Sequence, residues 1–111
     1  AEATSEKMAM GWFLNGKVSA VLGTHTHVQT SDEKILDRGT AYITDVGMTG
    51  PLDSVIGIRK EIALERLLTQ IPWKFDVAKE EVELQGVVID VDSKTGKSEN
   101  IQRIKIPLRQ N

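Results

Sequence analysis

The stretch KVSAVLGTHTHVQT, residues 17–30, joins an apolar run that ends in glycine to a segment holding both histidines of the chain. The run at 17–23 is short and shows little polar alternation, which predicts a strand covered on both faces, as in an α/β sheet. Ligand sites in open α/β sheets lie outside the carboxyl ends of the strands. We therefore expect the segment that follows Gly23 to lie at a ligand-binding edge.

His25 and His27 are separated by one residue in this segment. In an extended backbone, residues two apart point to the same side with their Cα atoms about 6.6 Å apart. Two imidazoles in that arrangement can bind one metal ion, or two ions lying about 3.5 to 4 Å apart. A structural or surface pair produces the same pattern, so both interpretations stay open on the residues alone.

Asp45 begins a second glycine-rich segment, DVGMTGP at 45–51, which follows another expected strand, TAYIT at 40–44. This turn could face the same edge of the sheet, where Asp45 would orient a histidine, because metal-bound imidazoles usually donate to a carboxylate or carbonyl. The alternative is a plain turn aspartate beside two glycines.

Signals for the remaining elements are mostly local. Residues 4–16 predict a helix with Thr4 or Ser5 as N-cap and Asn15-Gly16 as its end. A glycine inside that helix, Gly11, indicates either a close backbone approach or a tolerated glycine. The other expected elements are a surface excursion or hairpin at 31–40, an amphipathic helix at 59–68, a strand at 73–77 and two strands around a turn at 93–96.

The second half of the chain also contains DVDSKTGK, residues 90–97, which begins like a calcium-binding loop. That loop requires glycine at its sixth position and glutamate at its twelfth. Thr95 and Ile101 stand there instead, so the segment predicts a hairpin turn.

Composition narrows the class of protein. The chain has 111 residues, 40% hydrophobic and 27% charged, which fits at most one globular domain. Its net charge of −2 and its scattered basic residues argue against a general nucleic-acid groove. No apolar stretch approaches the roughly 20 residues needed to cross a bilayer. The lack of cysteine fits a reducing cytoplasm, so we expect a cytoplasmic protein whose metal ligands would be His, Asp, Glu or Asn.

Four longer strings taken together resemble one family. They resemble the YmdB-like branch of the calcineurin-like metallophosphoesterases, described as 2′,3′-cyclic-nucleotide 2′-phosphodiesterases. The resemblance covers residues 1–104, and the strings that carry it are AEATSEK (1–7), GWFLNGKVSAVLGTHTHVQT (11–30), GTAYITDVGMTGP (39–51) and DSVIG (53–57).

The resemblance implies an α/β fold and a metal role for His25 and His27. In this family the Gly-x-His-x-His segment supplies ligands to a dinuclear centre of two divalent ions, usually iron or manganese, with one histidine serving each metal. Such a centre lowers the pKa of a bound water and neutralises charge on the phosphoryl oxygens. The implied substrate is a small phosphodiester such as a cyclic nucleotide.

Family members are longer than this chain, and their remaining ligands lie earlier, including a histidine directly before the AEATSEK string. The resemblance therefore implies that residues 1–111 form the C-terminal part of a single four-layer α-β-β-α metallophosphoesterase domain. Two imidazoles cannot complete two coordination spheres of roughly four to six ligands each. We expect the chain alone to be inactive and to need an N-terminal portion of the same enzyme as its partner.

A rival hypothesis is a non-enzymatic α/β interaction module whose histidines are structural. The sequence also leaves a homo-oligomer open.

Overall fold

The computed structural model describes residues 3–51, 54–55, 58–59 and 82–108. They form a mixed α/β structure, as the sequence predicts, with two three-stranded sheets and one two-stranded sheet. The elements are α1 (Thr4–Leu14), β1 (Ala20–Leu22), β2 (Lys34–Ile35), β3 (Ala41–Ile43), β4 (Gly50–Pro51), β5 (Ser54–Val55), β6 (Ile58–Arg59), β7 (Val82–Val91) and β8 (Ser98–Leu108).

Helix α1 begins at Thr4, and its N-cap lies one or two residues before the expected caps. Its N-cap is Ala3, in an extended conformation, so the prediction that Thr4 or Ser5 caps the helix is wrong. Lys7 N–H donates to the Ala3 carbonyl (3.1 Å), so Thr4 and Ser5 lie inside the first turn of the helix. The helix ends before Asn15, which is its C-cap, and this confirms the predicted end.

Gly11 marks the contact between α1 and β3. It is buried, and a Cβ added there would lie 2.7 Å from Cδ2 of Tyr42. Of the two interpretations left open for Gly11, the close backbone approach is therefore the correct one. The missing side chain lets the tyrosine ring pack directly against the helix backbone.

The first sheet has the order β1-β3-β2, with β1 parallel and β2 antiparallel to β3. Its central strand confirms the strand predicted at 40–44 and is the core of the described chain, because Ala41, Tyr42 and Ile43 are at most 2% exposed. Strand β1 lies at the sheet edge, and Leu22 is 45% exposed. The strand covered on both faces is thus β3, and the prediction for 17–23 is wrong in this respect.

The predicted excursion at 31–40 is a hairpin that places β2 beside β3. Leu36 N–H donates to the Thr40 carbonyl (2.8 Å) and closes the turn.

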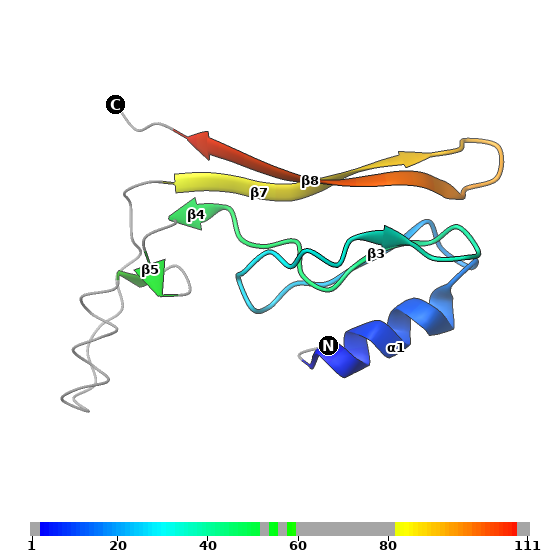
Figure 1. The fold of residues 1–111 in the computed structure, drawn as a ribbon, viewed down its shortest axis with the longest axis horizontal. Helices are drawn as coiled ribbons and strands as arrows, with labels where there is room; N and C mark the ends of the chain where they lie inside the picture. The colour runs from blue at the N-terminus through cyan, green and yellow to red at the C-terminus, as the bar shows by residue number, and fades with distance from the viewer. Residues whose placement is uncertain (1–2, 52–53, 56–57, 60–81, 109–111) are drawn as a thin grey trace.

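The second sheet has the order β4-β7-β8 and is dominated by the long antiparallel pair β7 and β8. This pair confirms the two strands predicted around the turn at 93–96. Strand β8 contacts β2 and β3, and Figure 1 shows the β7–β8 hairpin on the side of the first sheet away from α1. The order of layers is therefore helix, sheet, sheet.

The amphipathic helix predicted at 59–68 cannot begin at Arg59, because this residue pairs with Ser54 in the β5–β6 sheet. The rest of that predicted helix, and the strand predicted at 73–77, lie outside the described residues.

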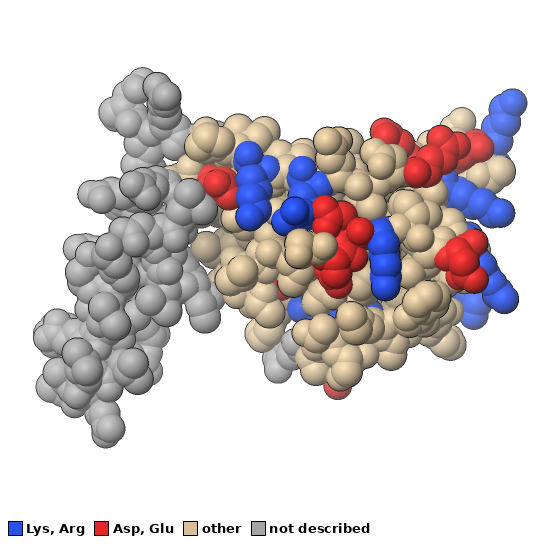
Figure 2. All heavy atoms as spheres, viewed as in Figure 1, with Lys and Arg blue, Asp and Glu red and all other residues tan. Residues whose placement is uncertain are grey.

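Charge is mixed over the face shown in Figure 2, where basic and acidic side chains lie side by side. Among the residues that the structure describes, no helix is long and apolar enough to span a membrane.

Candidate metal centre

The segment from Gly23 to Thr30, which we call the histidine loop, leaves the first sheet where β1 ends. Gly23 N–H donates to the Ile43 carbonyl (3.0 Å), and Val46 N–H donates to the Gly23 carbonyl (2.9 Å). Its far end returns to the same place, since Thr30 N–H donates to the Asp45 carbonyl (3.1 Å). Because β1 and β3 are parallel, the loop and the turn after β3 share one edge, as predicted.

Both histidines of the loop have exposed side chains and a left-handed backbone. The φ angle is 107° at His25 and 66° at His27, and these are the only positive values at non-glycine residues in the part of the chain that the structure describes. The expected extended geometry is therefore wrong, because the loop bends back between its two anchored ends. Such a conformation costs of order 1–3 kcal/mol per residue and persists only where neighbouring contacts impose it.

Asp45 provides one of these contacts. Its buried carboxylate accepts two bonds from Thr26, the residue between the histidines, from N–H (2.9 Å) and from Oγ1 (2.7 Å). It also accepts a bond from Gly47 N–H (2.9 Å), which shapes its own turn. Asp45 thus reaches the histidine loop through Thr26, whereas its direct action on a histidine ring stays a prediction.

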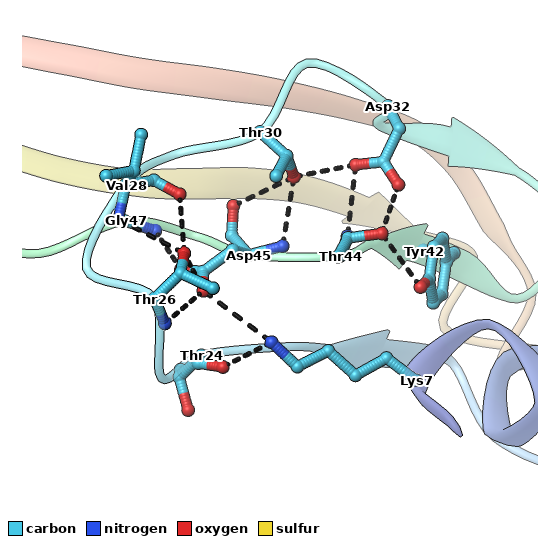
Figure 3. A network of polar contacts seen from close by, with 10 residues as sticks. All are labelled: Lys7, Thr24, Thr26, Val28, Thr30, Asp32, Tyr42, Thr44, Asp45 and Gly47. Carbon is cyan, nitrogen blue, oxygen red and sulfur yellow. Dashed lines mark hydrogen bonds and ion pairs between the residues drawn. The ribbon is translucent and has the colours of Figure 1, made fainter. Parts of the chain in front are cut away.

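Lys7 is a second contact, which the sequence analysis missed. Its Nζ donates to the Thr24 carbonyl (2.5 Å) and lies 3.7 Å from Oδ2 of Asp45, and both side chains are nearly inaccessible to solvent. Figure 3 shows the lysine reaching from α1 to the loop and the aspartate together. The available signal was its position four residues before Gly11, which places both on one helix face.

The pKa of Asp45 is set by opposing effects. Burial alone would raise the pKa of this carboxyl, but the bonds from Thr26 and Gly47 and the charge of Lys7 outweigh it, so the pKa lies below its ordinary value of 3.8. Asp45 is therefore an anion at neutral pH, and Lys7 is its counter-charge.

A second carboxylate, Asp32, continues the network from Thr30, the last residue of the histidine loop, to Thr44. Oδ1 accepts from Thr30 Oγ1 (2.7 Å) and from Thr44 N–H (3.1 Å), and Oδ2 accepts from the Thr44 hydroxyl. Burial alone would raise the pKa of Asp32, but the bonds from Thr44 and Thr30 lower it below 3.8. Because Thr44 gives its proton to Asp32, the Tyr42 hydroxyl must donate to Thr44 (2.9 Å). This chain of bonds links the α1–β3 contact to the loop (Figure 3).

Gln29 fastens the far end of the histidine loop to the second sheet. It is buried, and its Nε2 donates to the carbonyls of Gly86 (3.0 Å) and Val46 (3.2 Å). The loop is therefore held by α1, by the end of β3 and by β7.

The imidazoles of His25 and His27 are suitable metal ligands, but two ligands are too few to hold a metal ion. His25 and His27 are exposed imidazoles at the carboxyl end of parallel strands, where metals and substrates bind in such sheets. Within the described ranges, no group of three or more His, Cys, Asp or Glu side chains could hold a metal ion. Further ligands would have to come from outside these residues.

The chain is similar to known proteins over nearly its whole length. The family model described as "YmdB-like protein" matches residues 1–104. A Bacillus subtilis protein named 2′,3′-cyclic-nucleotide 2′-phosphodiesterase is 57% identical over 106 residues, which are 96% of this chain and 40% of that protein.

Two solved structures share the fold. One is a hypothetical protein from Thermus thermophilus, with a TM-score of 0.88 and 44% identity over 96% of this chain and 42% of that one. The other, described as a novel phosphatase from Mycoplasma pneumoniae, has a TM-score of 0.90 and 42% identity over 96% of this chain and 38% of that one. This chain thus spans about 40% of the length of the curated relative above. The family match covers nearly all of the present chain, which therefore belongs to the YmdB-like protein family.

Proposed function

We propose that this chain is part of a metal-dependent phosphodiesterase that hydrolyses small phosphodiesters such as 2′,3′-cyclic nucleotides. The observation that carries the proposal is the histidine pair, exposed and held in a costly backbone conformation at the carboxyl end of β1. The name of the B. subtilis relative supports the substrate class.

His25 and His27 are the proposed ligands of a dinuclear centre with two divalent ions, iron or manganese, one histidine to each. When bound, the ions would supply a hydroxide nucleophile at neutral pH and neutralise charge on the phosphoryl oxygens. The contribution of this chain is to present two imidazoles on one loop whose ends and centre are anchored.

The remaining ligands, and the acid that protonates the leaving oxygen, are proposed to come from an N-terminal portion of the same enzyme. In this proposal residues 1–111 are the C-terminal part of a single four-layer α-β-β-α metallophosphoesterase domain that acts in the cytoplasm. Trp12 and Phe13 on α1 are 57% and 68% exposed, so this helix offers apolar side chains against which the N-terminal portion could pack. The chain alone would then turn over no substrate.

The test compares the full-length protein with residues 1–111 alone. Hydrolysis of bis(p-nitrophenyl) phosphate and of 2′,3′-cyclic AMP is measured with Mn²⁺ and with a chelator. We expect metal-dependent hydrolysis by the full-length protein, background hydrolysis by the chain alone, and loss of activity in His25→Ala and His27→Ala. Thr95→Ala, an exposed change in the β7–β8 turn, is the control and should stay active.

Full activity in His27→Ala would contradict the proposal. A melting temperature of the full-length protein that ignores chelator, together with no hydrolysis, would instead support a non-enzymatic module with structural histidines.

A further inference from the structure

We propose that Lys7, Thr26 and Asp45 are positioning residues that hold the histidine loop in its metal-binding shape. This inference rests on the proposed metal role of His25 and His27. It assigns to three residues that do not themselves bind metal the task of fixing where the two imidazoles lie.

The backbone of His25 is the first step of the argument. The peptide before it is held by its carbonyl, because Lys7 Nζ donates to the Thr24 oxygen (2.5 Å). The peptide after it is held by its amide, because Thr26 N–H donates to Asp45 (2.9 Å). With both flanking peptide planes bonded to buried groups, His25 is constrained to its left-handed φ of 107°.

The Thr26 hydroxyl extends the same control to His27. Oγ1 donates to Oδ2 of Asp45 (2.7 Å) and accepts from Val28 N–H (3.3 Å). The two residues that flank His27 are thus tied to each other through one hydroxyl, which itself is tied to a buried carboxylate. This arrangement accompanies the second left-handed residue, with φ of 66°.

The ion pair explains why the anchor is firm. Asp45 can stay ionised while fully buried because it accepts three hydrogen bonds and has Lys7 as its counter-charge. Lys7 in turn is placed by α1, whose contact with Tyr42 at Gly11 brings the helix close to β3. Around the two histidines, the shape of the loop is therefore held by α1 and the end of β3.

A second threonine provides a matched comparison. Thr44 belongs to the same network and also gives its hydroxyl proton to an aspartate, but its side-chain partners are Asp32 and Tyr42. Its side chain reaches the histidine loop through Asp32 and Thr30, at the end of the loop away from the histidines. Thr26→Val and Thr44→Val are the same chemical change at the two ends of the network. A purely structural role for Thr26 predicts that only stability changes in both variants.

The experiment measures the affinity of the full-length apo-protein for Mn²⁺ by calorimetry, and the melting temperature in the absence of metal. Removal of groups that orient metal ligands typically weakens metal binding about 10- to 100-fold. We expect a loss of that size in Thr26→Val, restoration of Mn²⁺ affinity in Thr26→Ser, and unchanged Mn²⁺ affinity in Thr44→Val despite a lower melting temperature. Lys7→Met should weaken Mn²⁺ binding in the same way as Thr26→Val.

Wild-type Mn²⁺ affinity in Thr26→Val, or equal losses in Thr26→Val and Thr44→Val, would overturn the inference. His27→Ala separates its failure from that of the proposed function. If His27→Ala loses Mn²⁺ while Thr26→Val does not, only the positioning role is wrong. If His27→Ala keeps its Mn²⁺ affinity, the metal role of the loop is wrong, and the positioning role is wrong with it.

Discussion

The histidine loop and the turn of the β7–β8 hairpin are both exposed, but they are held in different ways. The turn at residues 92–97 is closed mainly by its own members, since Asp92 N–H donates to the Lys97 carbonyl (2.9 Å) and Gly96 N–H to the Asp92 carbonyl (2.8 Å). Its one distant bond among the described residues runs from Ser19 Oγ to the Gly96 carbonyl (2.6 Å). The histidine loop is held by partners 17 and 19 residues away in the sequence, Lys7 to Thr24 and Thr26 to Asp45.

This difference distinguishes the β7–β8 turn, which only connects two strands, from the histidine loop, which forms the candidate site. The turn closes through its own backbone bonds, and the residue that takes its left-handed position is a glycine, which adopts it without strain. The histidine loop places two non-glycine residues in that conformation and depends on the folded protein to keep them there. Damage to its distant supports should therefore reach the loop, whereas damage to the turn should stay local.

Lys7→Met should have the largest effect on stability. It leaves the buried Asp45 without its counter-charge, and removing one partner of a buried pair costs about 3 to 5 kcal/mol of the free energy of unfolding. Urea unfolding of the full-length protein measures the change. The matched control is Arg103→Met, which breaks a partly exposed pair with Glu33 (34% and 22% exposed) and should cost about 1 kcal/mol or less. Equal costs in the two variants would show that the Lys7 pair is not a buried support.

Gly23→Ala should have the next largest effect, because Gly23 begins the loop against the backbone of β3. An added Cβ would lie 1.7 Å from the Thr44 carbonyl oxygen, which cannot rotate away. Overpacking of this kind costs about 1 to 3 kcal/mol, and we expect the upper end together with weaker Mn²⁺ binding. Gly86→Ala in β7 is the control, since a Cβ there meets open space among the described residues. A Gly23→Ala protein as stable as Gly86→Ala would refute the close approach.

Gly96→Ala tests the hairpin turn. Its φ of +75° is left-handed, and an L-residue there costs about 1 to 2 kcal/mol. Thermal unfolding should detect this loss, while Mn²⁺ affinity should equal that of the wild type. A weakened Mn²⁺ affinity in Gly96→Ala would contradict the claim that damage to the hairpin turn does not reach the histidine loop.

Asp32→Asn should have the smallest effect, a loss of stability that is present near neutral pH and disappears in acid. Because the pKa of Asp32 is lowered in the folded chain, the carboxylate stabilises the fold above its ordinary pKa of 3.8, and this contribution is lost as pH falls below that value. The free energy of unfolding, measured from pH 6 to pH 2, should fall less steeply in the variant than in the wild type. Parallel curves would show that Asp32 does not contribute to the acid sensitivity.

The sequence predicted what local residues control. The strand at 40–44, the hairpin around 93–96 and the close approach at Gly11 follow from apolar patterning, turn residues and a single glycine within a helix. The shared edge of the histidine loop and the 45–51 turn followed from the rule for parallel strands.

What the sequence could not predict depends on distant partners. The left-handed bend at His25 and His27 has no local signature, because it arises from bonds to Asp45 and from the return of the loop to β3. Lys7 was missed because its spacing from Gly11 places it on the same helix face but does not show that its amine is buried against Thr24. The predicted N-cap was wrong because Ala3, the actual cap, has no polar side chain that would identify it in the sequence.

The most direct test of the metal role is anomalous diffraction from crystals of the full-length protein grown with Mn²⁺. The account predicts two Mn²⁺ peaks, each within about 2.0 to 2.3 Å of one imidazole nitrogen, with one peak beside His25 and one beside His27. Mn²⁺ bound elsewhere, with both rings turned to protein groups instead, would contradict it.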